Sequence, residues 1–386
     1  MTDHNHSTLS EGILQLLTEN GLDCLPELLR VLLNAAMRQE RQQFLQAQPF
    51  ERTPERQAHA NGFKEKTVAT RIGSITVDIP QVREGGFYPS SLEKGLRSER
   101  ALTLALAEMY VQGVATRRVA QITEQLCGVS VSASQVSRAA AELDGVLSTW
   151  RSRPLGEFRY VYLDARYESV RIDGHLHDCA ILIALGVDPS GKRQLLGVSV
   201  SLSEAEVHWR QFLQSLLTRG LCGVRLVVSD DHAGLKLARK AVFGGVAWQR
   251  CQFHLQKNAQ SYVTKTEHKA PLAAAIRAIF NTANRFEAEA LLAKTVGEWR
   301  KVNPKGAAWM EDNLPDGFHV FAFPESHRRL LRTTNGLERV NQEVRRRTRV
   351  CRQFPNEASC LRLVSAVLME ISDEWQTGKT YLTFED

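Results

Sequence analysis

Between residues 157 and 254 the chain alternates apolar segments, turns and amphipathic stretches in an order that few folds allow. Three apolar, β-branched segments come first, separated by turn sequences at Asp173-Gly174 and Pro189-Ser190-Gly191. A segment with apolar residues at helical spacing follows, and then strand, helix and strand patterns. The predicted elements are strands over 160–172, 178–188 and 194–202, a helix over 204–219, a strand over 225–229, a helix over 233–242 and a strand over 246–253. This order predicts one α/β core in which the first three strands are antiparallel.

Two acidic residues lie in or directly after predicted strands of this core, and a third lies on a helix near the C-terminus. Asp164 lies in the first predicted strand, Asp230 follows the fourth, and Glu338 stands on a basic helix near the C-terminus. Each has an ordinary structural explanation when it is taken alone. A strand-end aspartate is commonly a cap or turn residue, and Asp231 competes with Asp230 because adjacent residues point to opposite faces of a strand. Glu338 follows Asn335 by three positions, a pattern that favours a helix capping box.

Taken together, the order of the three acids predicts a catalytic site. Two acids that leave strands and a third on a helix after a helical insertion are the arrangement that two-metal phosphoryl transfer on nucleic acid requires. Hard divalent cations take oxygen ligands, which carboxylates supply. We therefore predict that Asp164, Asp230 and Glu338 are the catalytic and metal-binding residues, with two Mg²⁺ ions for which Mn²⁺ can substitute. The corresponding fold class is α/β, a ribonuclease H-like core interrupted by an all-helical insertion over about residues 255–325.

A basic cluster on the same late helix predicts a polyanionic partner. The net charge is +6 and the pI is near 9.0, which favours nucleic acid without requiring it. Glu338, Asn341 and Arg345 share a helical face, which would align a metal ligand, a polar contact and a phosphate contact. The predicted phosphate contacts on double-stranded DNA are Arg345, Arg346, Arg347 and Arg349.

The region before the core is predicted to be mainly helical, with one small β-containing module. Apolar spacing over residues 9–48 predicts two helices that break near Asn20-Gly21. Residues 67–72 and 75–80 predict a hairpin that turns at Gly73-Ser74, with basic residues around it. The hairpin is either part of a DNA-contacting module or a solvated basic hairpin, and the sequence leaves both readings open.

Residues 98–150 are predicted to be helical and to contain a helix-turn-helix. Gly128 supplies the turn, and Ser132 is a suitable N-cap for the second helix, which carries Gln135 and Arg138 as candidate DNA contacts. The alternative is a pair of packed helices in a bundle, because helix pairs with a glycine turn are common.

The cysteines indicate a reducing compartment. Seven cysteines are scattered without a CxxC pair, which argues against a disulfide framework. Cys251 and His254 form a CxxH element, and a buried cysteine beside a hydrogen-bonded histidine is favoured over half of a zinc site.

The N-terminus does not resemble a signal peptide, and the longest apolar stretch, residues 179–187, is too short to span a membrane. We expect a cytoplasmic protein without a membrane partner, associated with the nucleoid through DNA.

The motifs around these residues resemble those of Mutator-type bacterial insertion-sequence transposases. The matching segments are Leu163-Asp164-Ala165, Ser229-Asp230, Cys251-Gln252-Phe253-His254, Thr333-Thr334-Asn335-Gly336-Leu337-Glu338, and upstream Asn61-Gly62, Pro80-Gln81-Val82-Arg83 and Arg153-Pro154-Leu155. The resemblance extends over about residues 50–370. It implies that Asp164, Asp230 and Glu338 form a DDE triad. It also implies that Cys251 and His254, with Asn335 and Asn341, organise the site.

What the resemblance implies is a DNA transposase that binds terminal inverted repeats, cuts 3′ ends with Mg²⁺ and joins them to target DNA. Pairing of two ends implies a homodimer or a larger assembly. The alternatives are a ribonuclease H-like nuclease without strand transfer and a non-catalytic DNA-binding regulator derived from a transposase. The predicted domains are an N-terminal helical region (1–50), a β-containing DNA-binding module (51–97), a helix-turn-helix domain (98–153), a catalytic domain (157–254 with 326–372) and the helical insertion (255–325).

Overall fold

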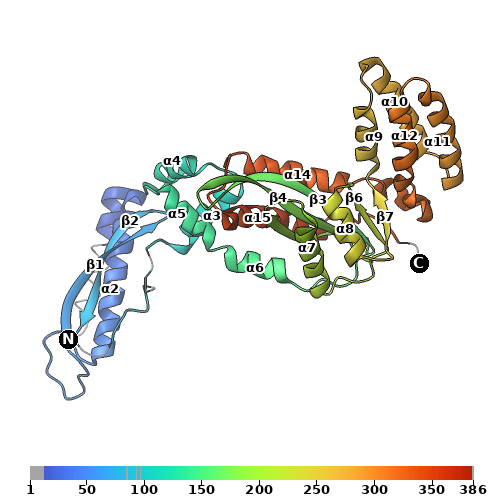
Figure 1. The fold of residues 1–386 in the computed structure, drawn as a ribbon. Helices are drawn as coiled ribbons and strands as arrows, with labels where there is room; N and C mark the ends of the chain where they lie inside the picture. The colour runs from blue at the N-terminus through green and yellow to red at the C-terminus, as the bar shows by residue number, and fades with distance from the viewer. Residues whose placement is uncertain (1–12, 84–85, 93, 96, 385–386) are drawn as a thin grey trace. The chain divides into compact units, whose positions relative to one another are not determined.

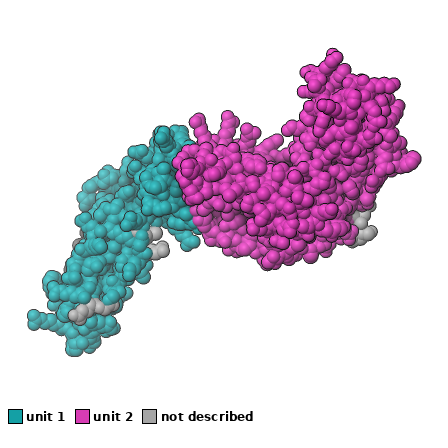
Figure 2. Space-filling model, in the orientation of Figure 1, with its two compact units in different colours: residues 1–142 teal, residues 143–386 magenta. Residues whose placement is uncertain are grey.

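The computed structural model of the chain describes residues 13–83, 86–92, 94–95 and 97–384. The chain divides into two compact units, residues 1–142 and residues 143–386 (Figure 2). The predicted start of the first helix, near Leu9, lies outside the described residues. Residues 13–20 are helical and are followed by the short helix η1, so the predicted break near Asn20-Gly21 is present.

The first unit begins with a long helix packed on a two-stranded hairpin. The hairpin strands pair in antiparallel register, with Thr70 opposite Gly73, so the turn is Arg71-Ile72 rather than the predicted Gly73-Ser74. Alternate residues of the hairpin, such as Val68 and Val77, are buried against Met37 of the helix, which is why one face of the ribbon is apolar. These elements are η1 Gly21–Cys24, α2 Leu25–Leu45, β1 Ala60–Thr70 and β2 Gly73–Val82.

Three further helices complete the first unit: α3 Arg100–Val111, α4 Thr116–Cys127 and α5 Ala133–Ala141. Gly128 ends α4 with a φ of 61°, a conformation that glycine adopts without strain. Ser132 caps α5, and its side chain and that of Gln135 form a capping box. The predicted helix pair and its caps are therefore present. Gln135 and Arg138 are exposed, and their contact with DNA stays a prediction.

The second unit is built on one mixed sheet with the strand order β5–β4–β3–β6–β7 (Figure 1). The first three strands are antiparallel, and β6 and β7 extend the sheet in parallel from β3. The elements are α6 Asp144–Ser152, β3 Tyr160–Ile172, β4 His175–Val187, β5 Arg193–Ser201, α7 Glu206–Thr218, β6 Leu226–Ser229, α8 Ala233–Val242 and β7 Ala247–Arg250. The α/β class is confirmed, and β3 has the predicted bounds.

The two faces of the sheet are covered by different helices. Val161 and Leu163 of β3 are buried in a core with Trp209 of α7 and Leu235 of α8. Because side chains alternate along a strand, Tyr162 and Asp164 point to the opposite face. That face meets the C-terminal helices α14 Asn335–Thr348 and α15 Glu357–Thr377. Asp164 therefore lies on the side of the sheet that α14 covers.

The helical insertion begins earlier than the sequence predicts. The predicted last strand to residue 253 is wrong, because β7 ends at Arg250 and Cys251 is already the N-cap of a helix. The carbonyl of Cys251 accepts a helical hydrogen bond from the N–H of Leu255 at 3.0 Å. The insertion helices gather beside β7 (Figure 1). They are α9 Gln252–Ser261, α10 Thr266–Phe280, α11 Arg285–Arg300, α12 Pro304–Asn313, η2 Leu314–Gly317, η3 His319–Ala322 and α13 Glu325–Leu331.

The insertion has its own apolar core. Leu255, Ile276, Leu292 and Met310 come from four different helices and are buried together. In the described part of the chain, no helix is both long enough and apolar enough to cross a membrane.

Candidate active site

The site forms where α14 lies against β3. Asn341 Nδ2 donates a hydrogen bond to Asp164 Oδ2 at 2.8 Å, and Asp164 Oδ1 accepts one from the Ala165 N–H at 3.0 Å. Glu338 precedes Asn341 by three residues, so the two side chains lie on one face of α14. The Asn341 contact therefore brings the Glu338 face of the helix to the aspartate of the strand.

The Asp164 carboxyl lies in surroundings that oppose its negative charge. Burial raises the pKa of Asp164 to about 7; the charge of His254 lowers it in part, and the carboxylates of Asp230 and Glu204 raise it further. Asp164 and Asp230 are thus close enough to influence each other's charge. A cation beside them would relieve the repulsion, so the pair favours a positively charged ligand.

The two adjacent aspartates after β6 have different partners. Asp231 forms ion pairs with Lys236 at 3.1 Å and with Arg250 at 3.0 Å, and the Arg250 side chain is only 4% exposed. Asp230 accepts a hydrogen bond from the Asp231 N–H at 2.7 Å. Its charge raises the pKa of both Asp164 and His254. Asp231 is therefore committed to a structural ion pair, while Asp230 faces the candidate site.

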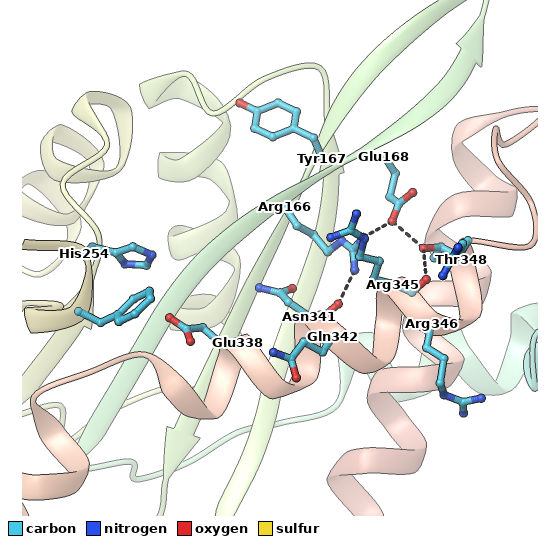
Figure 3. A pocket seen from close by; sticks show the side chains of 12 residues that line it. Arg166, Tyr167, Glu168, His254, Glu338, Asn341, Gln342, Arg345, Arg346 and Thr348 are labelled. Carbon is cyan, nitrogen blue, oxygen red and sulfur yellow. Dashed lines mark hydrogen bonds and ion pairs between the residues drawn. The ribbon is translucent and has the colours of Figure 1, made fainter. Parts of the chain in front are cut away.

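Glu338 does not cap α14. The N-cap is Thr334, without a side-chain capping bond, and Asn335 is already the first helical residue, so the expected capping box is absent. Glu338 Oε1 is buried and has no hydrogen-bond partner among the described residues. Figure 3 shows the Glu338 side chain extending from α14 toward the part of the pocket where His254 lies. The structural explanation for this acid is thereby removed.

Cys251 ties the start of α9 to the start of α14. Its sulfur accepts hydrogen bonds from the N–H and the hydroxyl of Thr334 at 3.4 and 3.5 Å. Hydrogen bonding to Cys251 raises the pKa of His254 to about 9 against the effect of burial, with further contributions from Asp230 and Asp164. Burial opposes ionisation of the Cys251 thiol, yet hydrogen bonds from His254 and Thr334 lower its pKa overall. The raised pKa favours the charged form of His254, and its charge in turn lowers the pKa of Asp164.

Glu338, Asn341 and His254 line a groove of about 1150 Å³, and α14 forms one side of it (Figure 3). Arg345 and Arg349 are exposed there, and neither has an acidic partner in the described residues. The lining residues are Arg166, Tyr167, Glu168, Phe253, His254, Glu338, Asn341, Gln342, Arg345, Arg346, Thr348 and Arg349. The groove combines a basic wall with a carboxylate, which suits a phosphate backbone approaching bound cations.

Comparison with known proteins decides the family. The family model described as transposase, Mutator family, matches residues 1–378. The chain belongs to the Mutator family of transposases. It is 58% identical to the transposase for insertion sequence element IS406 of Burkholderia multivorans, over 95% of both chains. It is 41% identical to the transposase for ISRM5 of Rhizobium meliloti, over 100% of this chain and 97% of the relative. The identity with the transposase for IS256 in transposon Tn4001 of Staphylococcus aureus is 36%, over 98% and 99% of the two chains.

The arginine cluster of this Mutator-family chain is less uniform than the sequence predicts. Arg347 is buried and forms ion pairs with Glu343 at 3.0 Å and Glu370 at 3.1 Å, so these ion pairs would have to open before Arg347 could contact phosphate. Arg346 is exposed but pairs with Glu343 at 2.6 Å. The physical reason is helical geometry, because Arg347 follows buried Val340 and Val344 on the inner face of α14.

Sequence reasoning missed a polar network that fastens α14 to β3. Arg166 Nη1 donates to the Asn341 carbonyl at 2.6 Å and pairs with Glu168, which accepts a hydrogen bond from the Thr348 hydroxyl at 2.7 Å. Asp164, Arg166 and Glu168 alternate along one strand face. That alternation was the signal in the sequence that could have found the network.

The oxygen atoms of the site suit a hard divalent cation. Glu338 Oε1 and Asn341 Oδ1 are buried without hydrogen-bond partners in the described ranges. The charge of Asp230 also raises the pKa of Asp164. Within the residues that the structure describes, no three His, Cys, Asp or Glu side chains form a ready-made metal group. The fit is therefore one of donor chemistry alone.

Proposed function

We propose that the chain is a DNA transposase that binds the terminal inverted repeats of its element, cuts their 3′ ends in a Mg²⁺-dependent reaction and transfers them to target DNA. The observation that carries the proposal is the 2.8 Å hydrogen bond from Asn341 to Asp164, which brings the Glu338 face of α14 to the strand aspartate beside a basic groove. The strand order β5–β4–β3–β6–β7, with the first three strands antiparallel, supports a ribonuclease H-like catalytic core.

In this proposal Asp164, Asp230 and Glu338 would hold two Mg²⁺ ions, for which Mn²⁺ can substitute. When bound, such ions make a water or a 3′-hydroxyl a better nucleophile and stabilise the leaving oxygen. Two other residues of the chain would orient and stabilise the carboxylates. Asn341 fixes the orientation of Asp164, and the charge of His254 offsets part of the repulsion between the aspartates.

Recognition of the element's ends is assigned to the first unit. The β-containing module over residues 51–97 and the helix-turn-helix formed by α4 and α5, with Gln135 and Arg138, would contact the inverted repeats. Because two ends must be held together for transfer, we propose a homodimer or a larger assembly on DNA.

The test uses the full chain, DNA with the element's two ends, a target plasmid and Mg²⁺, with products mapped to the nucleotide. We expect 3′-end nicks and joined products, both lost on chelation of the metal and restored by Mn²⁺. Cleavage without any joined product would indicate a nuclease of the ribonuclease H type. Binding with neither product would indicate a regulator.

Arg345→Ala should weaken binding to all DNA sequences about equally and reduce the slope of log affinity against log salt by about 1. The reason is that Arg345 is exposed in the groove without an acidic partner among the described residues. Affinity measured between low and moderate salt on element-end and unrelated DNA checks this.

Arg347→Ala is the matched control from the same helix. Because Arg347 is buried and paired with two acids, we expect a lower melting temperature and an unchanged salt slope. A loss confined to inverted-repeat DNA for Arg345→Ala would contradict a phosphate contact.

A further inference from the structure

The basic groove contains an exposed aromatic ring that the proposed chemistry does not use. Phe253 is 48% exposed although it is a large apolar side chain, and it lines the groove together with Glu338 and Arg345. Burying an apolar ring of this size would stabilise the fold, because it removes apolar surface from water. Because Phe286 is even more exposed, exposure alone does not mark a binding residue; what distinguishes Phe253 is that it lines the same groove as Glu338 and Arg345.

The two residues before Phe253 are tied to the segment that leads into α14. Gln252 N–H donates to the Arg332 carbonyl at 2.9 Å, and the Cys251 sulfur accepts two bonds from Thr334. The Phe253 and His254 rings lie 5.6 Å apart with an angle of 65° between their planes. These bonds fix the backbone at the first turn of α9, from which the Phe253 side chain reaches the groove that Glu338 also lines.

The surroundings of the ring identify the chemistry of its partner. Arg345, Arg346 and Arg349 line the same groove and would follow a phosphate backbone, while Phe253 offers a flat apolar face. A positively charged groove with an aromatic platform is the combination that binds single-stranded nucleic acid by base stacking. In an intact duplex the faces of the bases are covered by their neighbours, so a ring can stack only on a base that has left the helix.

We propose that Phe253 stacks on an unpaired nucleobase next to the bond that is cut, so that the groove takes a DNA end whose local base pairing is opened. The inference rests on the proposed function and names the form of its substrate. Opening the pair would give the strand the freedom to bring its phosphate to Glu338. Tyr167, 49% exposed on the same groove, supplies a second aromatic side chain beside the strand.

The test is a double-mutant cycle measured by binding alone, with Ca²⁺ in place of Mg²⁺ so that DNA is not cut. Element-end DNA carries an abasic nucleotide at each position around the cut site in turn, and affinities are measured for wild type and Phe253→Ala. We expect Phe253→Ala to weaken binding of DNA without an abasic nucleotide by roughly 5- to 100-fold. The substitution should have little effect on DNA from which the stacked base is missing. Phe253→Trp should restore binding, whereas Phe253→Leu should not.

Phe286→Ala is the matched control, because Phe286 is 80% exposed on α11 and does not line the groove. We expect it to bind every substrate like wild type. Equal losses for Phe253→Ala at all abasic positions, or no loss at all, would overturn the stacking assignment while leaving the proposed function standing. Failure of wild type to bind element-end DNA would overturn both, and binding without cleavage in Mg²⁺ would count against the proposed function alone.

Discussion

Glu338→Gln should abolish DNA cleavage, with a loss of about three orders of magnitude or more, while affinity for element-end DNA stays within about twofold of wild type. The amide keeps the size of the side chain and removes only its charge. Glu338 Oε1 has no hydrogen-bond partner among the described residues, and Thr334 rather than a capping box begins the helix. The substitution would therefore remove the charge of a proposed metal ligand without removing a structural hydrogen bond. Cleavage rate and affinity, measured on the same DNA, check this.

The matched control is Glu343→Gln on the same helix. Hydrogen bonds from Arg346 and Arg347 lower the pKa of Glu343 to about 2, and this acid does not line the groove. We expect it to lower the melting temperature and to retain cleavage. If Glu338→Gln retained cleavage, Glu338 would not belong to the catalytic site. If Glu338→Gln lost its melting transition, Glu338 would have a structural role.

The sheet could be predicted because its strands are locally self-consistent. In the β3 segment the apolar residues follow strand periodicity, and in the α8 segment they follow helix periodicity. Both elements have the predicted bounds. The end of β7 could not be predicted in this way. Cys251 and Phe253 add apolar residues after Arg250, but the Cys251 carbonyl accepts a hydrogen bond from Leu255 and its sulfur accepts one from Thr334, a residue 83 positions away. Contacts so distant along the chain leave no local pattern.

The sequence was enough to nominate the candidate acids, whose catalytic role stays a prediction, but not to predict their hydrogen-bond and ion-pair partners. The order of the acids along the chain was enough to nominate Asp164, Asp230 and Glu338, and the structure brings the Glu338 face of α14 to Asp164 through Asn341. Which acids are free to act depends on tertiary contacts instead. The capping pattern at Asn335 was misleading because the chain turns into the helix at Thr334, where the sulfur of Cys251 holds it.

Asp230→Asn and Asp231→Asn should separate catalysis from stability. Asp230→Asn should lower cleavage by about three orders of magnitude with little change in melting temperature. It should also lower the pKa of Asp164, because the Asp230 carboxylate contributes to raising it. Cleavage rates, together with nuclear magnetic resonance titration of labelled aspartates, measure both effects.

Asp231→Asn should have the opposite profile. Its carboxylate pairs with Arg250, whose side chain is 4% exposed, and with Lys236. Among the described residues, Asn313 at 2.9 Å, Asp316 at 3.8 Å and the Trp309 ring, whose centroid is 5.7 Å away, would then remain as partners of the buried guanidinium. We expect a destabilisation of about 1–3 kcal/mol, with cleavage per folded molecule close to wild type. If Asp231→Asn were inactive and Asp230→Asn active, the second metal ligand would be Asp231, and the ion pair with Arg250 would have to open when the cation binds.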